Sequence, residues 1–254
     1  NVGLFLGRCL PFATAFMLMT SDRRMRVLWA GAVFVMLFAI ALSQSAGAIF
    51  LGVPAALALV LVLVWRRRAW IPLAGMAIIL ILGLVFALQM PRFARALDFD
   101  QGTNFYRVRV WQSTINVIED HPITGLGLDQ FLYAFRGTYI MPDAWEEPNL
   151  SHPHNILLDQ WVRLGIAGVG LLVAMQIVFW RRTFKYYQQI IHHRSQQNRL
   201  MLVLAVGIMA SMFNLLVHGM VDHSIYVTDL AVVFALLLGL AVNLPEVGAA
   251  GDSR

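Results

Sequence analysis

Seven long apolar segments dominate the sequence. They occupy residues 2–20, 27–43, 47–64, 71–90, 156–180, 200–220 and 226–243. Each has roughly the 17–25 residues that an α-helix needs to cross about 30 Å of hydrocarbon. The segments are continuously apolar and lack the alternation of a membrane β-barrel. Only 13% of all residues are charged, against about 25% in soluble domains. The sequence therefore predicts an all-α, polytopic bundle of transmembrane helices.

Basic residues between the apolar segments predict the orientation of the chain. They form three clusters: Arg23, Arg24 and Arg26; Arg66–Arg68; and Arg181, Arg182, Lys185, Arg194 and Arg199. The formal charge of +5 could also suit a nucleic-acid-binding protein, but short basic clusters between membrane spans are typical of cytoplasmic loops. The intervening loops are poor in Lys and Arg, and we expect them on the external face. No nucleic-acid partner is expected.

This alternation predicts four sections in the chain. Residues 1–90 hold four transmembrane helices, 91–155 form one large external loop, 156–243 hold three more helices, and 244–254 form a cytoplasmic tail. The first residue is Asn1 rather than Met, and an apolar run begins at once. We therefore expect further N-terminal helices upstream of this sequence.

The large loop is expected to carry helices of its own. Within residues 105–120, apolar residues recur at helical spacing and predict one buried face. The members of this face are Val108, Trp111, Ile115 and Ile118. Asn104 is a plausible N-cap for this helix, and Pro122 ends it. A second short helix is expected within residues 128–140.

A histidine-rich stretch, residues 151–155, stands immediately before the apolar segment at 156. We expect Pro153 in the first turn of that helix, with Ser151 or His152 as its cap. His154 would then lie at the helix N-terminus, where the helix dipole disfavours imidazolium. A neutral imidazole can accept a proton, so His154 is a candidate general base. The alternative is a histidine that only caps and packs.

Other polar residues near or inside the apolar segments have alternative readings. Arg8 could bind an anionic substrate group or pair with a carboxylate such as Asp222. His218 and Asp222 are four residues apart and would share a helix face. They could orient His154, bind a sugar, or simply hydrogen-bond to each other. No metal-ligand cluster and no cofactor motif is evident.

Three further charged residues are expected to have structural roles. Arg163 should lie on the opposite face of its helix from His154 and pair with Asp159, four residues earlier. Arg109 should point away from the side of Arg107, toward solvent or lipid headgroups.

Three motifs resemble those of the O-antigen ligase and polymerase family. The stretch from His154-Asn155 to Gly165 and Gly168 is similar to the family pattern His-(Asn/Ser/Gln)-x9-Gly-x-x-Gly. The other two are Arg107-x3-Trp111 followed by His121-Pro122-x2-Gly125-x-Gly127 and Phe131, and Phe5-Leu6-Gly7-Arg8 followed by Pro11. Together these stretches cover most of the chain.

The resemblance implies a GT-C-like membrane fold in the inner membrane and a specific reaction. A glycan would pass from undecaprenyl diphosphate to an acceptor hydroxyl on the external face. His154 would be the base, Arg107 would bind the donor diphosphate, and Asn155, Arg8, His218 and Asp222 become candidate substrate-binding residues. The acceptor would be a lipid-linked or glycan-linked sugar, and no cofactor is implied.

One departure and two alternatives remain. Many members carry Ser-Arg-Gly-Ala at an external turn, whereas this chain has Ser45-Ala46-Gly47-Ala48, with alanine at the arginine position. A polymerase of the same family would differ from a ligase only in its acceptor. A transporter would place ionisable groups near the bilayer midplane, whereas the candidates here gather at the external face, which favours an enzyme.

Overall fold

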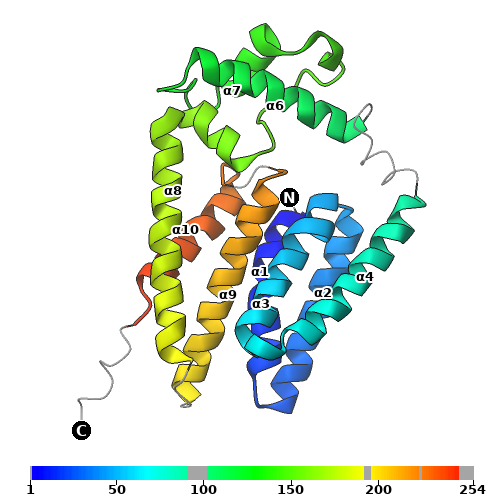
Figure 1. The fold of residues 1–254 in the computed structure, drawn as a ribbon, viewed down its shortest axis with the longest axis vertical. Coiled ribbons are helices and arrows are strands. Elements are labelled where there is room, and N and C mark those ends of the chain that lie inside the picture. Colours follow the sequence, from blue (N-terminus) through cyan, green and yellow to red (C-terminus); the bar gives the residue numbers. More distant parts are fainter. Residues whose placement is uncertain (1, 91–101, 192–195, 223–224, 246–254) are drawn as a thin grey trace. The chain divides into compact units, whose positions relative to one another are not determined.

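The computed structural model describes residues 2–90, 102–191, 196–222 and 225–245. These residues form helices and connecting turns without any strand, which confirms the predicted all-α class (Figure 1). The longer helices are α1 (Val2–Met19), α2 (Arg23–Ser43), α3 (Val53–Trp65), α4 (Trp70–Leu88), α6 (Gly102–Asp120), α8 (Ile156–Ile190), α9 (Gln196–Gly219) and α10 (Thr228–Val242). Predictions that fell on residues 91–101, Arg194 and 246–254 lie outside the described residues.

Six of these spans are long and apolar enough to cross a membrane, so the chain is a multi-pass membrane protein. They are α1, α2, Ala48–Arg68 (which contains α3), α4, α8 and the Asn198–Gly219 part of α9. The seventh predicted segment forms α10, which has only 15 residues and spans about 22 Å at 1.5 Å per residue. Hydrocarbon offers no hydrogen-bond partner to backbone N–H and C=O groups. The apolar segments therefore form helices, in which these groups bond to one another.

The chain divides into two compact units. Unit 1 comprises Asn1–Ile78, Gln176–His218 and Ile225–Arg254, and unit 2 comprises Ile79–Met175 and Gly219–Ser224. Each unit is built from segments that are distant in the sequence. Unit 1 holds most of the membrane-spanning helices, and unit 2 holds the described part of the predicted large loop with the beginning of α8.

In unit 1, α1 packs against α2, α3 and α10. Small and apolar side chains such as Ala15, Val60 and Val206 are buried completely where α1, α3 and α9 meet. Most residues of α2 are exposed instead, although the helix is strongly apolar. This distribution is that of a helix whose outer surface faces lipid, because lipid tails solvate apolar side chains as well as a protein core does.

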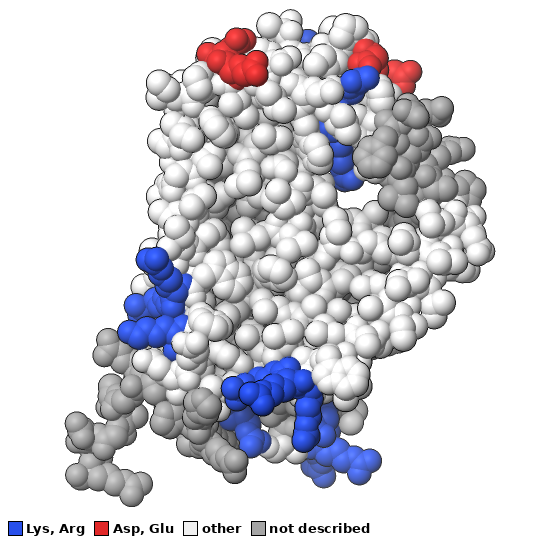
Figure 2. Space-filling view, viewed as in Figure 1, with Lys and Arg blue, Asp and Glu red and all other residues white. Residues whose placement is uncertain are grey.

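The basic clusters of unit 1 lie at one end of its helices. Arg199, in the first turn of α9, donates a hydrogen bond to Ser21 in the α1–α2 turn. Tyr187, late in α8, donates to the carbonyl of Leu63 near the end of α3 at 2.7 Å. Figure 2 shows Lys and Arg as separate groups on a surface that is otherwise largely uncharged. Their common end agrees with the predicted alternation of the loops.

In unit 2, α6 forms as predicted, but the centre of its buried face is shifted from the predicted one. Val110 and Val117 are fully buried and pack with Phe131, Phe135 and Val162. The predicted face is correct in part: its members Trp111 and Ile118 pack against this cluster, but Ile115 is 48% exposed. A shift of one position along the sequence moves the buried stripe by about 100° around a helix. Because α6 contains many polar residues, the spacing of its apolar residues does not specify which face is buried.

The predicted cap of α6 is also wrong. The helix begins at Gly102, so Asn104 lies inside the first turn. Its Oδ1 faces Arg107 Nη1 at 3.4 Å. The second short helix is present as α7 (Phe131–Ala134), continued by a π-helical turn at Phe135–Tyr139.

Two tyrosines tie α6 to the chain that follows it. Tyr106 donates to Glu146 Oε2 at 2.5 Å, and Tyr139 donates to Asp120 Oδ2 at 2.7 Å. The hydrogen bond to Glu146 raises the pKa of Tyr106 to about 12, and the bond to Asp120 raises the pKa of Tyr139. The loop is thus an ordered part of unit 2 across these residues.

The turn that follows α6 packs against α8 at a kink formed by a glycine. Gly165 has φ +66°, in the left-handed region that favours glycine. A Cβ there would lie 1.8 Å from the carbonyl oxygen of Ile123. The backbone N–H of Leu126 donates to the carbonyl of Val162 at 2.7 Å, and that of Ile166 donates to Pro122 at 3.2 Å. The family-like stretch that begins at Arg107 and the one that begins at His154 therefore meet, backbone against backbone, at Gly165.

Candidate functional site

The candidate site of unit 2 begins at the N-terminus of α8. Asn155 is the cap of this helix, since its Oδ1 accepts hydrogen bonds from the N–H groups of Leu157 at 3.0 Å and Leu158 at 3.1 Å. The predicted caps, Ser151 and His152, instead contact each other at 3.0 Å. Pro153 precedes the helix and does not lie in its first turn. Asparagine is among the strongest N-capping residues, because its short side chain reaches two free N–H groups.

Asn155 also holds the chain segment that follows α9. Its Nδ2 donates to the carbonyl of Met220 at 3.1 Å. Both ends of the amide are therefore engaged within the protein, and these contacts fix the position of Asn155 at the start of α8.

Replacement of the cap should loosen the whole site. We expect Asn155→Ala to lower the free energy of unfolding by about 1 kcal/mol, because two N–H groups of α8 lose their acceptor. Thermal unfolding in detergent measures this change. Asn155→Ser, which retains a capping oxygen, should recover most of the loss, and equal melting of the alanine variant and the parent would contradict the role.

His154 is held by Asp222. The two side chains meet with Nδ1 and Oδ1 3.2 Å apart, and each is about one quarter exposed, at 22% and 23%. His154 has φ +52°, an uncommon conformation for a non-glycine residue, and the turn it makes precedes the cap of α8. Because α9 ends at Gly219, Asp222 lies beyond that helix, and the prediction that it shares a helix face with His218 is wrong.

This arrangement prepares the imidazole for proton transfer. An Nδ1–H that donates to a carboxylate leaves the lone pair of Nε2 available. The carboxylate orients the ring and stabilises the imidazolium that forms when Nε2 takes a proton. His152 lies beside this pair, with its ring centroid 4.2 Å from that of His154.

The arginines of unit 2 differ in how far they are neutralised. Arg109 Nη2 pairs with Asp143 at 2.6 Å, so the prediction that it points to solvent or headgroups is wrong. Arg163 pairs with Asp159 and with Asp129, each at 2.8 Å. The Asp159 pair is the one expected from the sequence.

Arg107 keeps donors that no described carboxylate takes up. Among the described residues it forms no ion pair, and its buried Nε has no hydrogen-bond partner. Burial lowers the pKa of its guanidinium, and the charge of Asp222 acts in the opposite direction. Arg107 is thus a half-buried cation near the Asp222 carboxylate, with capacity left for an anion.

The two other predicted residues belong to unit 1. Arg8 is 1% exposed on α1, and its Nη1 donates to the carbonyl of Leu230 on α10 at 2.9 Å. His218, near the end of α9, is also 1% exposed. The structure thus brings Arg107, His154, Asn155 and Asp222 together within unit 2 and places Arg8 and His218 within the helical core of unit 1.

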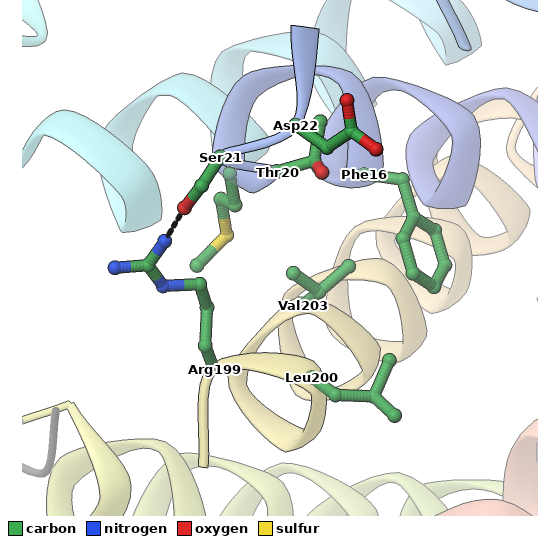
Figure 3. Close-up of a pocket in the computed structure, with 8 residues that line it drawn as sticks. Phe16, Thr20, Ser21, Asp22, Arg199, Leu200 and Val203 are labelled. Carbon is green, nitrogen blue, oxygen red and sulfur yellow. Dashed lines mark hydrogen bonds between the residues drawn. The ribbon is translucent and has the colours of Figure 1, made fainter. Parts of the chain in front are cut away.

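Unit 1 also contains a pocket of about 520 Å³ at its basic end. Its lining combines apolar side chains such as Phe16 and Val203 with the polar side chains of Ser21, Asp22 and Arg199 (Figure 3). No predicted site residue is among those that line it.

Two contacts of the site had no signal in the sequence. Trp111 Nε1 donates to the carbonyl of Pro153 at 2.8 Å, which joins α6 to the histidine stretch. Arg163 donates a hydrogen bond to Asp129, which has φ +57° and lies in the turn between Gly127 and Phe131. The spacing of Trp111 from Arg107 pointed to a shared helix but could not name the carbonyl that Trp111 meets.

Fold and site together define a multi-pass membrane protein in which unit 2 holds an imidazole in contact with a carboxylate and a guanidinium that forms no ion pair with a described residue. The sequence model of a family described as O-antigen ligase matches residues 31–173, more than half of the chain, and the protein belongs to this family. The matched range includes Arg107, His154 and Asn155 and ends before His218 and Asp222. No curated protein matches the sequence significantly. The family consists of glycosyl-transferring ligases and polymerases that act on lipid-linked glycans.

Proposed function

We propose that the protein transfers a glycan from undecaprenyl diphosphate to an acceptor hydroxyl, with His154 as general base and Arg107 as the ligand of the diphosphate. The observation that supports this most directly is the 3.2 Å contact between His154 Nδ1 and Asp222 Oδ1. It leaves Nε2 of a partly exposed histidine free to accept a proton, within a family of glycosyl-transferring enzymes.

In the proposed step, the acceptor hydroxyl oxygen forms a bond to the anomeric carbon of the donor sugar. Its proton passes to Nε2 of His154, and Asp222 stabilises the resulting imidazolium. The bond between the anomeric carbon and the diphosphate oxygen breaks. Its electron pair leaves with undecaprenyl diphosphate, so the charges balance without another reactant.

Arg107 supports the other half of this step. Negative charge develops on the diphosphate oxygens as the bond breaks, and a guanidinium can bind two such oxygens with parallel N–H groups. The side chain is half-buried, so its charge is less screened than on an open surface. No described carboxylate neutralises the Arg107 guanidinium. It is therefore suited to bind the negatively charged diphosphate of the glycan donor.

The proposal includes the location and the type of acceptor. The basic ends of the unit 1 helices would face the cytoplasm, with the site on the external face of the inner membrane in a GT-C-like fold. We favour a ligase, whose acceptor is a lipid-linked sugar, over a polymerase, whose acceptor is another glycan repeat.

Turnover in vitro tests the proposal. The purified protein in lipid nanodiscs would receive a labelled undecaprenyl-diphosphate glycan with either a lipid-linked sugar or a second glycan repeat. We expect labelled glycan on the lipid-linked sugar and release of undecaprenyl diphosphate. Transfer only to the second repeat would identify a polymerase, and no transfer to either acceptor would overturn the proposed activity.

A conservative change at Arg107 should damage this turnover. We expect Arg107→Lys to lower kcat by at least about tenfold and Arg107→Gln by about 100-fold, because the planar pair of donors is lost first and then the charge. The matched change Arg109→Lys should have little effect, since that charge already pairs with Asp143. Equal losses at the two positions would indicate a structural role for both.

A further inference from the structure

Three potential metal ligands converge at the candidate base. His152, His154 and Asp222 each present one ligand atom, and these atoms all lie within 4.8 Å of one another. Two come from the stretch before α8 and one from the segment after α9, so only the tertiary structure assembles them. Each side chain is partly exposed, which leaves an ion a path from solvent.

We propose that these three residues bind Zn²⁺ and that the bound ion switches the site off. Part of this inference rests on the proposed function, because the inhibition concerns transfer by His154. The binding itself does not depend on that function. Three protein ligands with a fourth position open to water is a common arrangement of zinc in proteins.

The ligand set favours zinc over the common alkaline-earth ions. Two imidazoles and one carboxylate suit Zn²⁺, whereas Mg²⁺ and Ca²⁺ prefer oxygen ligands in larger number. Zinc bonds of about 2.1 Å would place tetrahedral ligand atoms about 3.4 Å apart. The partners here are 3.2 Å apart for the His154–Asp222 pair, so rotation of His152 toward that pair would complete the geometry.

Arg107 works against the ion and limits its affinity. Its guanidinium lies in the electrostatic range of Asp222 and would repel a divalent cation. Coordination by the two imidazoles must outweigh this repulsion. We therefore expect binding in the micromolar range, on the order of 1–10 µM, rather than the tight binding of structural zinc sites.

A bound Zn²⁺ would prevent His154 from acting as a base by changing which ring nitrogen carries the proton. A metal between Nδ1 of His154 and the Asp222 carboxylate would take the place of a proton shared by these two atoms. In a neutral imidazole ligated through one nitrogen, the other nitrogen carries the proton. Nε2 would then be a donor and could no longer accept the proton of an acceptor hydroxyl.

Metal titration of the purified protein in nanodiscs tests the inference. We expect one Zn²⁺ per chain by calorimetry, a tetrahedral ligand-field spectrum with Co²⁺, and no binding of Mg²⁺. His152→Ala should weaken Zn²⁺ binding at least about tenfold and remove the inhibition, while its transfer without metal stays at the parental level. His121→Ala, which changes another exposed histidine of unit 2, should bind Zn²⁺ like the parent.

The outcomes separate the two proposals. Parental binding in His152→Ala, or binding in the parent no tighter than in Asp222→Asn, would overturn the zinc site. His152→Gln provides a second test should the alanine variant unfold. Zinc binding that follows the expected pattern in a protein without any transfer activity would keep the zinc site and overturn the proposed function.

Discussion

A His154→Ala variant is expected to lose transfer almost completely while it still inserts and folds. General base catalysis contributes about 100- to 10,000-fold to a rate, and the His154 imidazole lies at hydrogen-bond distance, 3.2 Å, from the Asp222 carboxylate. The side chain packs at the partly exposed edge of unit 2, so its removal should leave the core around Val110 and Phe131 intact. Turnover of labelled donor in nanodiscs measures the loss.

Two further variants make the His154 result specific. His152→Ala removes the neighbouring ring and should leave metal-free transfer unchanged. Asp222→Asn should lower kcat more than it changes KM, because it leaves the ring in place but removes the charge that stabilises imidazolium. Parental transfer by His154→Ala would remove the base assignment, whatever the other two variants do.

Gly165→Ala should produce the largest loss of stability. Its φ of +66° strains any side chain, and the added Cβ would lie 1.8 Å from the carbonyl oxygen of Ile123, which belongs to the backbone and cannot rotate away. Such strain costs on the order of 3 kcal/mol. Thermal unfolding in detergent should then show a midpoint roughly 10 °C lower.

Gly170 provides the matched control for this change. It lies in the same helix, and a Cβ built there meets nothing within 4 Å. Gly170→Ala should therefore leave the midpoint unchanged or raise it slightly, since alanine favours a helix over glycine. If the two alanine variants had the same unfolding midpoint, the close approach of the 121–127 turn to Gly165 would not be important for stability.

The arginines show how much of the site the sequence could predict. The pairing of Arg163 with Asp159 follows from spacing within one helix, and it is present at 2.8 Å. The partner of Arg109 does not follow, because Asp143 is 34 residues away in an irregular turn. Whether an arginine of unit 2 meets a described carboxylate depends on where the chain between α6 and α8 places Asp129 and Asp143.

The candidate base shows the same limit. His154 was a candidate because it was expected at the N-terminus of an apolar helix, where the helix dipole disfavours imidazolium. Its partner is 68 residues away in sequence and stands three residues past the end of α9. The cap was misassigned for a related reason, since the left-handed turn at His154 shifts the start of α8 to Ile156.

The sequence by itself determined that this chain is a bundle of membrane-spanning helices with one polar loop unit. In hydrocarbon, each apolar segment must form all of its backbone hydrogen bonds within itself, and a helix does so between residues close in sequence. Only the tertiary structure decided which imidazole meets a carboxylate, which arginine keeps free donors, and why a glycine stands at position 165. These depend on contacts between distant segments, whose geometry no local pattern of apolar and charged residues specifies.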